Sequence, residues 1–130
     1  MDKQRPKYTS VRVGKNFAVV RPEHRLVGDN ETEEFEAIMK QLDDQQYEFA
    51  VVDLGAIDWI NSTGLRALYD AQTRFCWRGA RMCLARVDKR IHNLFLVVGL
   101  SLKFKTFSSV EDAIAVGLGE PDEVAPTAPA

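Results

Sequence analysis

The chain has 130 residues, of which 45% are hydrophobic, and a formal net charge of −2. This size supports one domain with a single core, and the small acidic surplus argues against a nucleic-acid-binding protein, which usually carries an excess of Lys and Arg. No apolar run approaches the roughly 18 residues of a membrane span, and the N-terminus lacks the apolar segment of a signal peptide. We therefore expect a cytoplasmic protein without membrane insertion.

The first half of the chain reads as a hairpin, a helix and a buried strand. Alternation over 8–13 and an apolar run at 17–20 predict two antiparallel strands. Asn30 and Glu33 have the spacing of a capping box, which predicts a helix from there to about Leu42. The apolar run 47–54 is rich in β-branched residues and predicts a strand that is buried on both faces.

The second half continues the alternation of helices and strands. We expect a helix at 62–78 that ends at Gly79, and then a strand at 82–87. A helix follows Asp88 and ends at Gly99, and a strand follows at 104–107. The last helix begins with the pair Ser108 and Glu111, which has capping-box spacing, and runs to 117. The order β-β-α-β-α-β-α-β-α predicts an α/β fold whose sheet is mostly parallel, with the first strand as an antiparallel edge. We expect an N-terminal extension at 1–7, one domain at 8–117 and a disordered acidic tail rich in Pro and Ala at 118–130.

A short polar motif follows the buried strand and opens the second helix. It reads Asn61-Ser62-Thr63-Gly64-Leu65, and a Ser or Asn directly ahead of a helical run is a helix N-cap signal. The hydroxyl of Ser62 then lies at the positive end of the helix dipole, which tolerates negative charge, including a phosphate on the hydroxyl itself. The motif is typical of a regulatory serine as well as of a plain helix cap.

This motif resembles the signature of STAS domains, the family of bacterial anti-sigma factor antagonists. In that family a buried strand leads into Asp-Ser-Ser/Thr-Gly-Leu, and the first Ser is the phosphoacceptor. The resemblance implies that Ser62 is the phosphoacceptor, with Thr63 as the second choice, and it covers residues 8 to 117. Further likenesses are the run from Leu94 to Leu100 and the segment from Val110 to Ala113, while Asp29 is the counterpart of the family's Gly-Glu-Leu-Asp motif.

Two positions of the motif bear on its role. Gly64 lies in the first helical turn, where glycine costs helix stability of up to about 1 kcal/mol, and we interpret it as space for the backbone of a partner such as a kinase. Asn61 replaces the family's Asp, and a neutral amide would donate a hydrogen bond to a phosphate rather than repel it. The same replacement would also fit a family branch that has lost kinase recognition.

Catalytic and metal-binding patterns are weak. Asp53 and Asp58 have no His or Cys near them in sequence, and we interpret His24 and His92 as surface or partly buried side chains. Cys76 and Cys83 have neither the spacing of metal ligands nor that of a disulfide framework, so we expect two small buried hydrophobic residues. A hydrolase that uses Ser62 lacks a base to activate the hydroxyl. We therefore predict no enzyme activity, no cofactor and no metal.

Charge is uneven between the first two expected helices. Eight acidic residues and one Lys lie between Asp29 and Glu48, whereas seven basic and two acidic residues lie between Ser62 and Arg90. Solvated helix faces with some mutual pairing would explain this, as would a complementary surface for one protein partner.

The resemblance implies a phosphorylation-regulated protein-binding switch. Unmodified Ser62 would bind an anti-sigma factor that is a serine kinase of the histidine-kinase-like ATPase type, phosphorylation would release it, and a serine phosphatase would reset the switch. The residues expected to contact this partner cluster in the motif and its neighbourhood, and they are Asp29, Asn61, Ser62, Thr63, Gly64, Leu65 and Arg66. The alternative is a non-phosphorylated accessory STAS subunit of a lipid-transport ABC ATPase complex.

Overall fold

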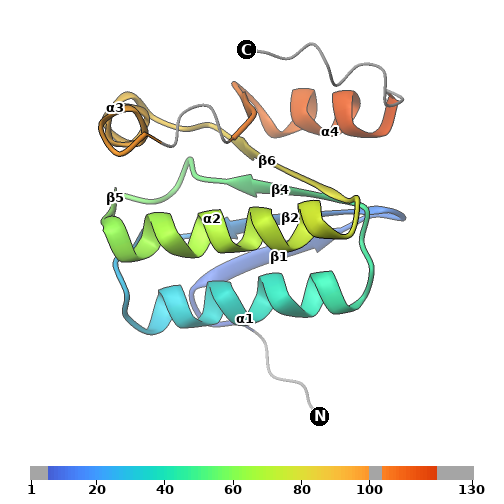
Figure 1. The fold of residues 1–130 in the computed structure, drawn as a ribbon, viewed down its shortest axis with the longest axis horizontal. Coiled ribbons are helices and arrows are strands. Elements are labelled where there is room, and N and C mark those ends of the chain that lie inside the picture. The colour runs from blue at the N-terminus through green and yellow to red at the C-terminus, as the bar shows by residue number, and fades with distance from the viewer. Residues whose placement is uncertain (1–5, 100–103, 120–130) are drawn as a thin grey trace.

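The computed structural model describes residues 6–99 and 104–119 and shows helices on both sides of a central sheet (Figure 1). The strands are β1 (Thr9–Val13), β2 (Phe17–Pro22), β3 (Arg25–Leu26), β4 (Phe49–Asp53), β5 (Trp59–Ile60), β6 (Arg81–Ala85) and β7 (Thr106–Phe107). The helices are α1 (Asn30–Asp44), α2 (Ser62–Trp77), α3 (Lys89–Val97) and α4 (Val110–Gly119). The predicted disordered tail lies, from residue 120 on, outside the described residues and stays a prediction.

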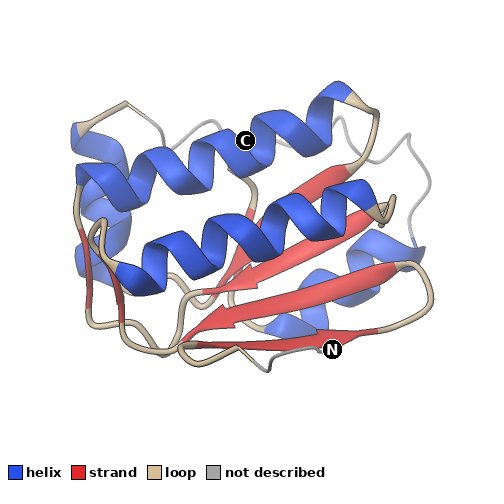
Figure 2. Ribbon diagram, turned by 90° about the horizontal axis from the view of Figure 1, so that it is seen from below, coloured by secondary structure: helices blue, strands red, loops and turns tan. Residues whose placement is uncertain are grey.

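The main sheet has the order β1-β2-β4-β6-β7. The β1–β2 pair is antiparallel and the other three pairs are parallel, so the predicted mixed sheet with an antiparallel edge strand is confirmed. Figure 2 shows α1 and α2 side by side across one face of this sheet. Because β2, β4 and β6 are parallel, their carboxyl ends lie at one edge of the sheet, where the loops that lead to α1, α2 and α3 begin.

Two short strands form a separate parallel ribbon that the sequence did not indicate. β3 pairs with β5, with Arg25 opposite Trp59 and Leu26 opposite Ile60. Neither strand is among the elements expected from the sequence, because two residues are too few for a period to show. The ribbon brings the segment before α1 directly alongside the segment before α2.

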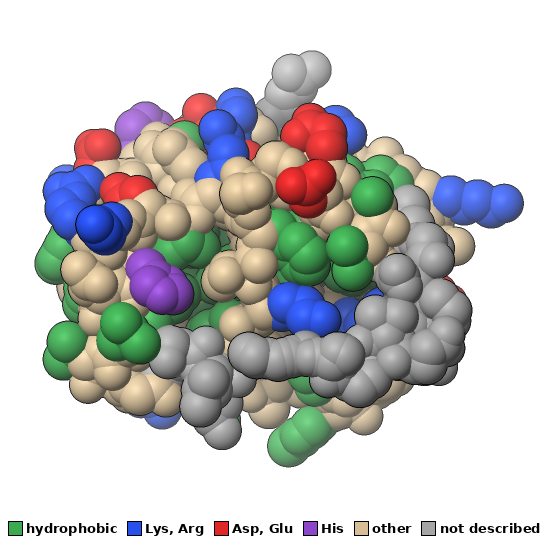
Figure 3. All heavy atoms as spheres, turned by 90° about the horizontal axis from the view of Figure 1, so that it is seen from above, with side chains coloured by type: hydrophobic (Ala, Val, Ile, Leu, Met, Phe, Trp, Pro, Cys, Tyr) green, Lys and Arg blue, Asp and Glu red, His purple; other side chains and the backbone are tan. Residues whose placement is uncertain are grey.

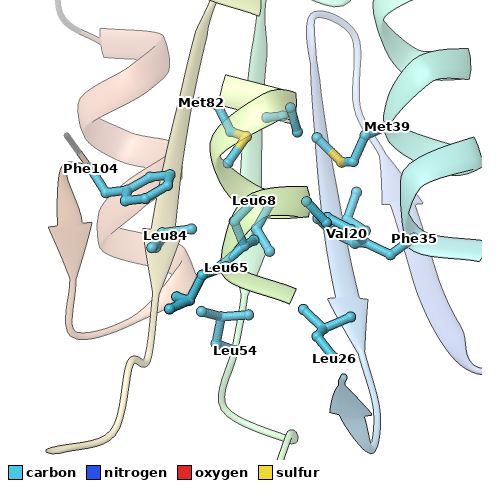
Figure 4. Packing of buried hydrophobic residues seen from close by; sticks show 14 of the residues in the cluster. Val20, Leu26, Phe35, Met39, Leu54, Leu65, Leu68, Met82, Leu84 and Phe104 are labelled. Atoms are coloured by element: carbon cyan, nitrogen blue, oxygen red, sulfur yellow. The ribbon is translucent and has the colours of Figure 1, made fainter. Parts of the chain in front are cut away.

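The core lies on both faces of β4, as its continuous apolar run predicts. Ala50 and Val52 join the larger cluster beneath α1 and α2, whereas Phe49 and Val51 join the smaller cluster beneath α4. Figure 4 shows the larger cluster, in which Leu65 and Leu68 of α2 lie between side chains of the strands. Leu65 is only 3% exposed. Burial of this helix face fixes how far α2 can shift along the sheet.

Helix caps differ from the expected ones at two places. Asp29, not Asn30, caps α1, with its carboxylate accepting from the backbone N–H of Glu31 at 3.3 Å. Ser109, not Ser108, caps α4 by accepting from the N–H of Asp112. Asp88 caps α3 as predicted, and the N–H of Ile91 that donates to it lowers the pKa of this carboxyl. The misplaced caps are one residue off because several adjacent polar residues compete for each cap.

The two cysteines have different environments. Cys83 is buried, as expected, and burial raises the pKa of its thiol to about 12. Cys76 is exposed near the end of α2, so the expectation that it is buried is wrong. Its helical position is compatible with either face, and only the packing of α2 determines which side faces solvent.

The charges of α1 and α2 pair in part with each other. The Arg78 guanidinium donates to Asp43 at 2.5 Å and to the Tyr47 carbonyl at 2.7 Å, and both charged side chains are largely buried. Lys40 and Asp44 pair within α1 at 3.7 Å. On the opposite face, which carries α3 and α4, cationic, acidic and apolar side chains are interspersed (Figure 3).

Candidate functional site at the start of helix α2

Ser62 is the first residue of α2 and is exposed. The N-cap is Asn61, whose side-chain oxygen accepts from the N–H of Gly64 at 3.1 Å, so the interpretation of Ser62 as the cap is wrong. Among the described residues the Ser62 hydroxyl has no hydrogen-bond partner. The hydroxyl therefore projects into solvent at the positive end of the helix without a structural bond that modification would break.

Asn61 also connects α2 to the segment before α1. Its side-chain amide donates to the Val27 carbonyl at 3.0 Å, and its backbone N–H donates to the Leu26 carbonyl at 3.2 Å. An Asp at this position would cap the helix equally well but would place an acceptor against the Val27 carbonyl. The departure from the family motif thus has a structural reason in this chain.

Gly64 is required by a contact within the chain. A Cβ built on Gly64 would lie 2.0 Å from the Leu26 carbonyl oxygen and 2.8 Å from Cγ1 of Ile60. The ribbon of β3 and β5 thus occupies the space that we assigned to a partner's backbone. Gly64 is buried, and its presence gives no separate support for a role of Ser62.

The remaining predicted contact residues fall into exposed and buried groups. Thr63 and Arg66 are exposed, whereas Leu65 is part of the core. Gly28 packs on Thr63, since a Cβ at Gly28 would lie 3.0 Å from the Thr63 methyl group. Asp29 follows directly, capping α1 and pairing with Arg25 at 3.2 Å. The structure thus brings the Asp29 segment and the α2 motif to one edge, without Gly64 and Leu65 on its surface.

Glu31 organises this edge and was not singled out from the sequence. Glu31 is 3% exposed, and its carboxylate accepts from three consecutive backbone N–H groups, those of Glu23, His24 and Arg25, at 2.9, 2.9 and 3.1 Å. These bonds hold the loop that enters β3. A Glu in the first turn of a helix usually indicates a favourable dipole interaction at the surface, so the sequence carries no signal for this buried role.

Asp53, the last residue of β4, has a structural partner. The Arg86 guanidinium donates twice to its carboxylate, at 2.9 Å in both bonds, and this bonding raises the pKa of Arg86. Asp58 is exposed, and Nδ1 of His24 lies 3.4 Å from Glu31. Within residues 6–99 and 104–119 no group of three His, Cys, Asp or Glu side chains is placed to hold a metal ion.

The sequence matches the STAS domain family over residues 8–113. The chain belongs to the STAS domain family. A comparison with curated proteins finds no match. None of the described helices of this STAS domain has the length and apolar character needed to cross a membrane.

Solved structures share the STAS fold at low sequence identity. The anti-sigma factor antagonist SpoIIAA in its unphosphorylated form is 15% identical with a TM-score of 0.74, and the match covers 88% of this chain and 99% of that one. A putative anti-sigma factor antagonist from Thermotoga maritima is 13% identical with a TM-score of 0.77, over 84% and 93% of the two chains. A sulfate transporter family protein from Wolinella succinogenes is 16% identical with a TM-score of 0.66, over 82% and 88%. At these identities the likeness establishes the fold.

Proposed function

We propose that this STAS domain is a phosphorylation-regulated protein-binding switch of the anti-sigma factor antagonist type, with Ser62 as the phosphoacceptor. The observation that carries the proposal is the exposed Ser62 hydroxyl, which is free of structural bonds at the first position of α2. Phosphorylation there changes the surface and leaves the cap of Asn61 in place. The fold survives the modification, and the interface is what changes.

The electrostatics around Ser62 support this role. Asn61 is neutral, the α2 N-terminus is a positive dipole end, and exposed Arg66 lies one helical turn further along. No ion pair engages Arg66 within the described part of the chain. A phosphate on Ser62 thus meets a favourable local field, whereas two added negative charges in a close-packed contact can lower partner affinity about a hundredfold or more.

An exposed aromatic residue extends the proposed contact surface. Trp59 of β5 is 44% exposed, two residues ahead of the Asn61 cap, and it stands opposite Arg25 in the ribbon. Exposed Trp and Arg side chains are enriched among the residues that dominate binding energy. We place Trp59 with Asp29, Ser62, Thr63 and Arg66 on the surface for an anti-sigma factor that is a serine kinase of the histidine-kinase-like ATPase type.

The test compares capture of this kinase partner by the wild type, Ser62→Ala and Ser62→Asp. The switch predicts retention by the first two and loss of about a hundredfold in affinity by the third. Ser108→Asp is the matched control, because it adds the same charge at an exposed serine between β7 and α4, and it should bind like the wild type. Equal binding by Ser62→Asp, or phosphate mapped to a residue other than Ser62 and Thr63, would contradict the proposal.

The alternative is a non-phosphorylated accessory subunit of a lipid-transport ABC ATPase. Asn61 in place of the family's Asp is the feature that would favour this alternative. The bond from Asn61 to the Val27 carbonyl accounts for that replacement without a change of function. Copurification with an ATP-binding-cassette subunit, unaffected by Ser62→Asp, would favour the alternative.

A further inference from the structure

An apolar pocket lies on the other side of the molecule from the proposed contact surface. It has a volume of about 230 Å³ and opens where α4 passes over the start of β6. β7 pairs only with Leu84 and Ala85, so its pairing does not extend to the first three residues of β6, which line the pocket. The apolar walls come from β4, β6, β7 and α4, and they include Phe49, Met82, Phe107 and Val116.

Among the residues that the structure describes, two cations and no acidic side chain line this pocket. The Arg81 guanidinium donates to the Gly117 carbonyl at 2.7 Å and lies 5.4 Å from the centre of the Phe49 ring, and no carboxylate of the described residues pairs with it. Lys105 is exposed and forms no ion pair with any residue that the structure describes. Cys83 also lines the pocket, and burial raises the pKa of its thiol to about 12, although the nearby charges of Arg81 and Lys105 act in the opposite direction.

We propose that this pocket binds a small amphiphilic anion, namely a medium-chain carboxylic acid. The alkyl chain lies against the Phe49, Met82 and Val116 side chains, and the carboxylate lies between Arg81 and Lys105. An apolar cavity with a few convergent polar groups is the usual form of a small-molecule site, and paired cations without acidic neighbours select a negatively charged head. This site is independent of Ser62 and of the proposed switch.

The test is a calorimetric titration of the full-length protein with hexanoate, octanoate and decanoate. One octanoate should bind per chain, and affinity should rise roughly fourfold per methylene until the pocket is full. The uncharged 1-octanol should bind at least about tenfold more weakly, because it gains nothing from the two cations. A lack of saturable octanoate binding below about 1 mM, or equal affinity for 1-octanol, would overturn the proposal.

Two variants locate the binding. Lys105→Glu should weaken octanoate by at least about tenfold and leave 1-octanol unchanged, whereas the matched charge reversal Lys89→Glu on α3 should leave both unchanged. Val116→Phe fills the pocket and should weaken both ligands. Because Val116 is partly buried, circular dichroism must show that the Val116→Phe protein still folds. If it does not fold, the result for the surface variant Lys105→Glu alone tests the proposed site. Octanoate affinity that is unaffected by Lys105→Glu would overturn the proposal. So would the finding that the protein forms a dimer through this pocket, shown by a dimer that Val116→Phe abolishes and octanoate does not disturb.

Discussion

At the start of α2 a single side-chain amide bonds to two different parts of the chain. Asn61 caps α2 through its oxygen and holds the Val27 carbonyl through its nitrogen. The capping half of this arrangement follows from the residue type and its place in the sequence. The other half depends on Val27, which is 34 positions away and reaches Asn61 only because β3 pairs with β5.

Replacing Asn61 separates these two contributions. Asn61→Ser keeps a capping oxygen but cannot reach Val27, so we expect a loss of about 1 kcal/mol in the free energy of unfolding, whereas Asn61→Ala loses both bonds and about 2 kcal/mol. Urea denaturation measures both. Asn30→Ala, at the first position of α1, is the control and should change stability by less than about 0.5 kcal/mol. A cost for Asn61→Ser as large as that for Asn61→Ala would show that the cap contributes nothing.

Other side chains at this scale show where sequence patterns stop being informative. The motif places Ser62 at a helix start, and the structure has it there. The burial of Glu31 and the exposure of Cys76 depend on which way each helix packs, and neither residue type nor spacing determines that. Trp59 lies in a segment of two residues without a period, so its exposure had no sequence signal.

At the scale of elements, the strands of the main sheet were predictable because their apolar runs are long enough to show buried faces. All five strands of that sheet and all four helices were expected from the sequence, with ends that differ by a few residues. The ribbon of β3 and β5 was not expected, because its two-residue strands are defined by each other and not by local preference. The reason for Gly64 was missed with it, since the obstructing carbonyl belongs to Leu26.

The contact between α2 and this ribbon can be tested at Gly64. Gly64→Ala would raise helix propensity by up to about 1 kcal/mol in an open helix, but here the new methyl group meets a backbone carbonyl. We expect a net loss of about 1–3 kcal/mol in the free energy of unfolding, measured by urea denaturation.

Gly79→Ala provides the comparison for Gly64→Ala. Gly79 has a φ of +81° and nothing within 4 Å of a built Cβ, so its replacement costs about 1 kcal/mol through backbone strain alone. A gain in stability for Gly64→Ala would mean that β3 moves aside easily, and would contradict the conclusion that the contact with the Leu26 carbonyl requires glycine at this position.

At the scale of the whole molecule, acid should weaken the fold through two carboxyl groups. The pKa of Glu23 lies below its ordinary 4.5, chiefly because the Ser10 hydroxyl donates to it, and that of Asp88 lies below 3.8, chiefly because of the Ile91 N–H. Their unfolded forms take up protons first as the pH falls. Their contribution to stability is therefore complete above about pH 5 and is lost as the pH falls through the folded pKa values.

Asp88→Asn isolates one of these groups, because Asn still caps a helix but does not titrate. We expect the variant to be less stable than the wild type above about pH 5, and this difference should shrink only as the pH falls below 3.8, through the folded pKa of Asp88. The free energy of unfolding of Asp88→Asn should therefore fall less than that of the wild type as the solution is acidified. Urea denaturation at a series of pH values measures this difference. An unchanged acid dependence in Asp88→Asn would remove Asp88 from the explanation.

The Leu26 carbonyl passes close to Gly64, so the length of the loop before α1 must match the position of the segment that opens α2. Inserting or deleting a residue between Pro22 and Asn30 would displace the carbonyls that bind Asn61, and so would reorient Ser62 without any change to its own motif. Designers who graft this motif onto another STAS scaffold should transfer the preceding loop together with it.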